Sequence, residues 1–212
     1  MKEKMNFGAM LKLGFILAVY STAACVGLAF VYSATGGIIE QRRQADLEAA
    51  LRELFPDADS FKAIIDIKSP DNAVVIEGDR ENPANTGAFA AVKNGRIAGV
   101  ALRTSRASYS GPVVLMTGVG PDGRIRGVKI LELSDTPGLG ANAASKTFYV
   151  DKSGKLNFLD QFRNKSASDP FVPKQDIAAI TAATITSAAV SSSVKIAGEA
   201  AVEWMRRKGE VW

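Results

Sequence analysis

The sequence contains no histidine and a single cysteine, Cys25, among its 212 residues. The lack of histidine removes the commonest general base, the usual nitrogen ligand of zinc, and every Ser-His-Asp or Cys-His arrangement. One cysteine forms no internal disulfide and no thiolate cluster. The composition therefore predicts no metal site and no histidine-based hydrolase, and any redox chemistry has to use an organic cofactor or one supplied by a partner.

A basic stripe and the GxxxxGK[ST] phosphate loop are also missing. The net charge of +4 is mild, and no basic stripe is interleaved with aromatic residues, so nucleic acid is not an expected partner. GxxxxGK[ST] does not occur, and the single GxGxxG match, Gly118–Gly123, lies at the turn of a predicted hairpin and not between a strand and a helix. Glu132 and Asp135 are close in sequence, but one ends a predicted strand and the other enters a turn. We expect both carboxylates to be solvated, and we predict no catalytic residue.

A long uncharged run lies near the N-terminus, from Leu13 to Tyr32. About 20 such residues are what an α-helix needs to cross a bilayer. The run is too long for a signal peptide, and no clean small-x-small site closes it. We predict a cytoplasmic segment at 1–12 and a retained single-pass anchor at 13–34, in the cell (inner) membrane. Lysines before the span favour this orientation and an extracytoplasmic globular domain, although Arg42 and Arg43 after the span weaken the bias.

A linker helix and the N-terminal part of the globular domain are expected over 35–84, after the anchor. Apolar residues at helical spacing between Glu40 and Phe55 predict that the anchor continues into an amphipathic helix, which Pro56 ends. Two short β-type runs, 61–67 and 73–77, predict the first strands of the globular domain.

The next part of the chain is rich in strands. Residues 88–92 and 96–104 flank Asn94-Gly95 and predict a hairpin, and residues 111–118 and 124–133 predict a second one. A short helix is predicted at 156–162, and a long one from Ala188 to Met205. Strands grouped together with helices at the ends predict an α+β fold with an antiparallel sheet and flanking helices.

The segment Thr181–Ser187 (TAATITS) stands just before the last predicted helix. Thr186 or Ser187 is the expected N-cap. The first turn of a helix has unpaired N–H groups and the positive end of the dipole, so it can hold a phosphate, and a threonine hydroxyl there could carry one covalently. The alternative is that the threonines only cap the helix. A second segment, Thr136–Gly140 (TPGLG), predicts either a rigid loop or a backbone surface for a flat ligand.

Five motifs together resemble a known family. They are Ser108–Pro112, Gly123–Leu131, Thr136–Gly140, Asp160–Phe162 and Thr181–Ser187, in this order. Their order and approximate spacing are similar to the FMN-binding domain of the G subunit of the Rnf electron-transport complex and the C subunit of the sodium-pumping NADH:quinone oxidoreductase. The resemblance places the FMN-binding domain at 85–208. The single anchor and the chain length fit the Rnf subunit better.

The resemblance implies an electron-transfer subunit of a membrane-bound, ion-translocating ferredoxin:NAD oxidoreductase, and no stand-alone enzyme. FMN would be joined through its phosphate to Thr184 by a separate flavin transferase, with Thr186 as the second choice. The TPGLG turn would lie against the flavin ring. Expected partners are the other membrane subunits, the transferase and membrane lipid. The implied cofactor-binding residues are Thr181, Ala182, Ala183, Thr184, Ile185, Thr186, Thr136, Gly138, Leu139 and Gly140.

The chain departs from the family pattern at three positions. Ala182 stands where the family usually has glycine, and its methyl penalises a backbone that needs positive φ. Ala178 stands where the transferase target usually has aspartate, with Asp176 out of register. Asp135 replaces a glutamate. The Asp135 change keeps the charge, but the changes at Ala178 and Ala182 motivate an alternative hypothesis, a membrane-anchored assembly module that has lost its flavin.

Overall fold

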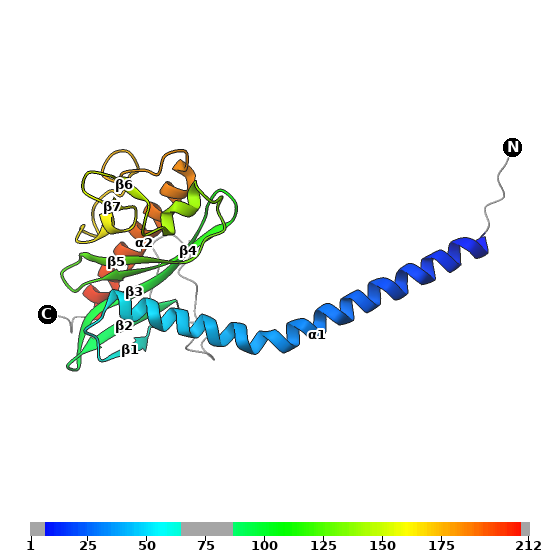
Figure 1. The fold of residues 1–212 in the computed structure, drawn as a ribbon. Coiled ribbons are helices and arrows are strands. Elements are labelled where there is room, and N and C mark those ends of the chain that lie inside the picture. Colours follow the sequence, from blue (N-terminus) through cyan, green and yellow to red (C-terminus); the bar gives the residue numbers. More distant parts are fainter. Residues whose placement is uncertain (1–6, 65–86, 209–212) are drawn as a thin grey trace. The chain divides into compact units, whose positions relative to one another are not determined.

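The computed structural model describes residues 7–64 and 87–208 (Figure 1). The chain forms two compact units, Met1–Ala45 and Asp46–Trp212. The predicted strand at 73–77 lies outside the described residues, as does part of the run at 61–67.

The first long helix, α1, spans Phe7–Leu54. Its apolar side chains in the first unit are exposed, Phe15, Leu17 and Phe30 among them. The most apolar 18-residue window between Met10 and Leu54 has a mean hydropathy of 2.0, and none of it is buried. By length and composition, this helix could cross a membrane. The prediction that the uncharged run continues as one helix that ends just before Pro56 is confirmed.

The second unit is organised around a five-stranded sheet of order β1-β2-β3-β4-β5, antiparallel throughout. The strands are β1 Ser60–Ala63, β2 Ala88–Lys93, β3 Arg96–Ala107, β4 Pro112–Val119 and β5 Ile125–Glu132. The β2–β3 turn has φ of 51° at Asn94 and 77° at Gly95, as a two-residue hairpin with these residues requires. Both predicted hairpins are confirmed.

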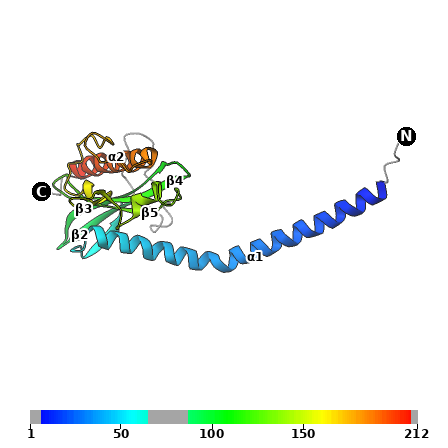
Figure 2. The ribbon, with the colours of Figure 1, turned by 45° about the horizontal axis from the view of Figure 1, so that its top comes forward.

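The final helix, α2 (Thr184–Lys208), covers one face of the sheet (Figure 2). Val100 and Leu102 of β3 face the α2 core, whereas Ala101 joins a smaller core on the other face with Leu51, Leu54 and Phe55. This alternation follows from the two-residue period of a strand. The second face is therefore closed by the last turns of α1, and the predicted α+β fold with flanking helices is confirmed.

Shorter elements connect the sheet to α2. They are the 3₁₀ turns η2 (Gly140–Ala144) and η3 (Asp160–Phe162) and the two-stranded sheet of β6 (Tyr149–Asp151) and β7 (Leu156–Asn157). The predicted helix at 156–162 is wrong, because that stretch forms β7 and η3. Asn157 turns the chain between them: its side-chain oxygen accepts from the N–H groups of Leu159 and Asp160.

Candidate functional site

A pocket of about 450 Å³ lies where the loop after β5 meets the start of α2. Its lining residues, which we call the threonine pocket, are Tyr109, Asp135, Thr136, Leu139, Gly140, Ala182, Ala183, Thr184, Ile185 and Thr186. The two segments singled out in the sequence therefore face each other across one pocket. Of the predicted site residues, only Thr181 and Gly138 are not in its lining.

The turn on one side of the threonine pocket is set by Pro137 and Gly138. The N–H of Leu139 donates to the carbonyl of Thr136 over 3.1 Å, and Gly138 has φ of 80°, which a residue with a side chain rarely adopts. The turn leaves Leu139 exposed beside the pocket. Tyr109 and Ile185 are exposed as well, so three large apolar side chains border one opening.

Asp135 lies at the base of the threonine pocket and is only 5% exposed. Its Oδ2 accepts hydrogen bonds from the hydroxyls of Ser108 and Thr186, each at 2.5 Å, and its Oδ1 accepts from the N–H of Ser110 at 2.8 Å. The expectation that Asp135 is solvated is therefore wrong. Glu132 is exposed, as expected, and pairs with Arg103.

The pKa of Asp135 reflects two opposing effects. Burial raises the pKa, but hydrogen bonds from Ser108, Thr186 and the N–H groups of Ser110 and Tyr109 outweigh burial and hold the pKa below its usual range. Asp135 is thus a buried anion stabilised by neutral donors.

The two threonines at the start of α2 have different surroundings. Thr186 is 1% exposed and its hydroxyl donates to Asp135. Thr184 is exposed, and its hydroxyl makes no hydrogen bond to any residue that the structure describes. The predicted N-cap at Thr186 or Ser187 is wrong, because α2 begins at Thr184. The Ser187 hydroxyl instead accepts from the N–H of Ile180 and donates to the carbonyl of Ala183.

Ala182 has φ of 59°, in the left-handed region. A residue with a Cβ there costs roughly 1–2 kcal/mol relative to the right-handed region. The strain anticipated at this position is therefore present, on the rim of the threonine pocket.

Comparison with known proteins identifies the family. Residues 108–199 match the FMN-binding domain, and residues 1–54 match the RnfG N-terminal region. The chain is 33% identical over 206 residues to the G subunit of the Na(+)-translocating ferredoxin:NAD(+) oxidoreductase complex of Acetobacterium woodii, covering 92% of this chain and 93% of the relative. It is 30% identical over 177 residues to the G subunit of the proton-translocating ferredoxin:NAD(+) oxidoreductase complex of Clostridium ljungdahlii, covering 81% and 80%.

The chain belongs to the RnfG family. Among solved structures, the crystal structure of Shewanella oneidensis NqrC matches with a TM-score of 0.45 and 16% identity, covering 72% of this chain and 73% of that one. The apolar helix and the relatives' membership of ion-translocating complexes together indicate a membrane-anchored protein.

The Asp160–Phe162 motif of this RnfG-family chain supports the segment that leads into α2. The Gln161 side chain accepts from the N–H of Ala178 at 2.8 Å and donates to its carbonyl at 3.1 Å. Phe162 is fully buried and meets Phe158 edge-on, with ring centroids 5.7 Å apart. Asp176, the nearest carboxylate to Ala178 in the sequence, accepts from the N–H groups of Phe171 and Val172, so this carboxylate already has a structural role.

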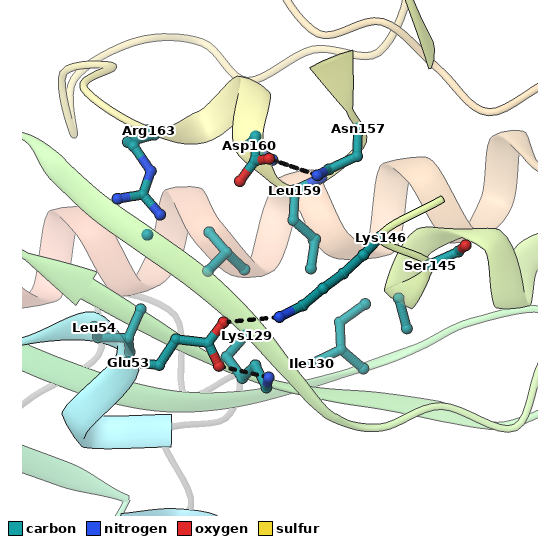
Figure 3. Close-up of a pocket in the computed structure, with 13 residues that line it drawn as sticks. Glu53, Leu54, Lys129, Ile130, Ser145, Lys146, Asn157, Leu159, Asp160 and Arg163 are labelled. Atoms are coloured by element: carbon teal, nitrogen blue, oxygen red, sulfur yellow. Dashed lines mark hydrogen bonds and ion pairs between the residues drawn. The ribbon is translucent and has the colours of Figure 1, made fainter. Parts of the chain in front are cut away.

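A second pocket of about 230 Å³, the lysine pocket, lies between the end of α1 and β5 (Figure 3). Glu53 accepts from Lys129 at 2.6 Å and pairs with Lys146 at 3.5 Å. The bond from Lys129 lowers the pKa of Glu53 against a smaller effect of partial burial. The other charged residues that line the lysine pocket are Asp160 and Arg163. Sequence reasoning missed this pocket, because its charges come from segments far apart in the chain.

Proposed function

We propose that this chain is the electron-transfer G subunit of a membrane-bound, ion-translocating ferredoxin:NAD oxidoreductase complex, and that FMN is joined to Thr184 by a phosphoester. The observation that carries the proposal is the exposed hydroxyl of Thr184 in the first turn of α2, without a hydrogen bond to any described residue and in one pocket with the TPGLG turn. The FMN-binding family match covers both segments.

The residues present fit an FMN phosphate at the start of α2. The first N–H groups of a helix have no intrahelical acceptor, and the helix dipole adds positive potential there. No acidic residue occupies the first turn of the 25-residue α2. The phosphate would then be held by Thr184 and the N–H groups that follow it.

The residues present also fit a flat, partly apolar ring. A ligand pocket typically combines apolar walls with a few fixed polar groups, and about 450 Å³ is in the range of such pockets. Leu139, Ile185 and Tyr109 supply apolar surface, and Gly140 also lines the pocket. When bound, FMN would supply one-electron redox chemistry, and the chain would contribute binding and the electrostatic environment of the ring.

The chain would work inside an assembly and not as an enzyme by itself. Its partners would be the other membrane subunits, lipid around α1, and a flavin transferase during maturation. The two relatives above carry names with different ions, so no particular ion is proposed. We propose an N-terminal cytoplasmic segment at 1–12, a span at 13–34, a linker helix and the N-terminal part of the globular domain at 35–84, and an FMN-binding domain at 85–208 on the extracytoplasmic side.

Sidedness is tested with the single native cysteine removed. A Cys25→Ala chain with Ser153→Cys, an exposed site in the globular unit, should react in intact cells with a thiol reagent that does not cross membranes. Labelling only after lysis would place the domain in the cytoplasm.

The flavin is tested on full-length protein from a host that contains the transferase. A denaturing gel viewed under ultraviolet light should show a fluorescent band, and the peptide that contains Thr184 should gain the mass of FMN minus water. Thr184→Ala should remove both signals while the far-UV circular dichroism is unchanged. If Thr184→Ala protein remained fluorescent and carried the added mass on Thr186, the attachment residue would be Thr186 instead.

Two observations favour a second candidate function, the assembly module that has lost its flavin. Ala182 is strained, and Ala178 brings no carboxylate to the segment before Thr181. A dark, unmodified band from the native membrane would support this candidate over flavin attachment.

A further inference from the structure

The first turn of α2 contains two threonine hydroxyls with different surroundings. Thr186 is buried and donates to Asp135, whereas Thr184 is exposed. We propose that Asp135 is a specificity-determining positioning residue, which withdraws the Thr186 hydroxyl and leaves Thr184 as the hydroxyl that receives the flavin phosphate. This inference rests on the proposed function and adds to it the reason why one threonine is chosen.

Asp135 ties three segments together through donors. An ionised carboxylate only accepts hydrogen bonds, and its partners here are two hydroxyls on Oδ2 and the N–H of Ser110 on Oδ1. These groups belong to the β3–β4 turn and to α2, while Asp135 itself stands in the loop after β5. Asp135 therefore joins the first turn of α2 to the two loops that border the threonine pocket.

Thr186 is enclosed by the backbone of Gly140. A Cβ added to Gly140 would lie 2.5 Å from the Thr186 Oγ1 and 2.6 Å from the Asp135 Oδ2, so the Gly140 backbone packs directly on their hydrogen bond. A phosphoryl group on Thr186 would need the room that Gly140 occupies. Thr184 has no such cover, since it is exposed and lines the same pocket.

The two threonine side chains leave the helix in different directions. Residues two apart on an α-helix are separated by about 200° around its axis. With Thr186 held against Asp135, the Thr184 side chain therefore leaves the helix in another direction, although both residues line the threonine pocket. The bond that fixes Thr186 inward also fixes Thr184 outward.

The attachment step itself is a group transfer without a change in redox state. The Thr184 oxygen attacks the phosphorus of an FMN unit activated as a phosphoanhydride, such as a flavin dinucleotide. The Oγ–P bond forms, the anhydride P–O bond breaks, the nucleoside monophosphate leaves, and the hydroxyl proton passes to a base of the transferase. Asp135 touches none of the reacting atoms, so it acts only by placing the first turn of α2.

The test compares full-length variants produced together with the transferase. Asp135→Asn keeps the shape and removes the charge, Thr186→Val removes the hydroxyl, and Glu53→Gln is a matched carboxylate-to-amide control in the lysine pocket. The fraction of chains carrying FMN, and the modified residue, are read by intact mass and peptide mapping. We expect Asp135→Asn and Thr186→Val each to lower the modified fraction at limiting transferase by about tenfold. The double variant should fall no further, and Glu53→Gln should match the wild type.

Two further measurements distinguish the proposed positioning role of Asp135 from a purely structural role. One varies the charge and length of the side chain, and the other measures stability in protein without flavin. Asp135→Glu keeps the charge but changes the length, so it should retain more modification than the isosteric Asp135→Asn; the reverse order would mean that shape alone matters. In protein made without transferase, the urea midpoints of Asp135→Asn and Thr186→Val should be non-additive, because one hydrogen bond links them.

The experiment distinguishes a failure of the proposed function from a failure of the role inferred for Asp135. Wild-type protein without any adduct would overturn the proposed function and this inference with it. Wild-type protein modified at Thr184, with unchanged modification in Asp135→Asn and Thr186→Val, would overturn only the role of Asp135. Modification of Thr186 in a Thr184→Ala chain that retains Asp135 would also overturn it.

Discussion

The two pockets of the globular unit each contain a carboxylate with a lowered pKa, and they differ in what stabilises it. In the lysine pocket, Glu53 is held by the ammonium groups of Lys129 and Lys146 at a partly exposed site. In the threonine pocket, Asp135 is buried and held by hydroxyl and N–H donors. Charges in the lysine pocket largely pair with one another, whereas the Thr184 hydroxyl has no hydrogen-bond partner among the described residues. The difference teaches that a carboxylate's pKa is lowered in two ways in this unit, by neutral hydrogen-bond donors at a buried position and by ammonium groups at a partly exposed one.

The largest difference between the pockets should appear at one glycine in each. Gly140→Ala introduces a methyl against the side chains of Asp135 and Thr186, which their mutual hydrogen bond holds in place, and overpacking of this kind costs about 3 kcal/mol. Gly127→Ala meets the flexible end of Leu54 at 3.1 Å, so its cost should stay below about 1 kcal/mol. Urea unfolding of the full chain in detergent, followed by the fluorescence of the buried Trp204, measures both. If Gly140→Ala and Gly127→Ala lowered the free energy of unfolding equally, the two pockets would not differ in how rigidly their neighbouring side chains are held.

The next largest effect concerns the buried anion. Asp135→Asn should lower the free energy of unfolding at pH 7 by about 2 kcal/mol, the scale of hydrogen bonds to a charged group. Because the folded pKa lies below the unfolded value of about 3.9, this contribution is complete above that value and is lost as the pH falls through the folded pKa. The gap between wild type and Asp135→Asn should therefore narrow below about pH 4. Urea titrations from pH 7 to pH 3 measure it, and a constant gap would contradict the assignment of the lowered pKa to Asp135.

Local signals in the sequence predicted much of the fold. Asn94-Gly95 determined the β2–β3 hairpin because both residues accept positive φ, and the uncharged run from Leu13 predicted the helix that leads into Pro56. The two segments of the threonine pocket were both singled out, although their contact was not predictable from spacing. Asp135 was misjudged because its burial depends on Thr186, 51 residues later in the chain. Local turn signals also did not separate β7 and η3 from a short helix at 156–162.

Backbone strain separates the two pockets as well. Ala182 in the threonine pocket has φ of 59°, and no described residue that lines the lysine pocket has positive φ. Ala182→Gly should stabilise the unit by about 1 kcal/mol, because glycine adopts this conformation without a steric penalty. The same change at Ala188, exposed inside α2, should destabilise it by about 1 kcal/mol. If urea unfolding showed stabilisation by Ala182→Gly and destabilisation by the change at Ala188, local strain at Ala182 would be confirmed. Destabilisation by both changes would contradict it.

The smallest expected change in stability comes from removing the Glu53 charge in the lysine pocket. Its dependence on salt concentration should distinguish it from the change caused by Asp135→Asn in the threonine pocket. The side chains of Glu53 and Lys129 are 47% and 35% exposed, and partly exposed ion pairs contribute only about 0.5 kcal/mol. Glu53→Gln should therefore cost about that much at low ionic strength and nothing measurable at about 1 M salt, where the screening length is roughly 3 Å. The cost of Asp135→Asn should not change with salt, because its partners are neutral and the carboxylate is covered by protein. If the two costs responded to salt alike, Asp135 would have to be accessible to ions, and a water-excluded hydrogen bond could no longer explain the choice between Thr184 and Thr186.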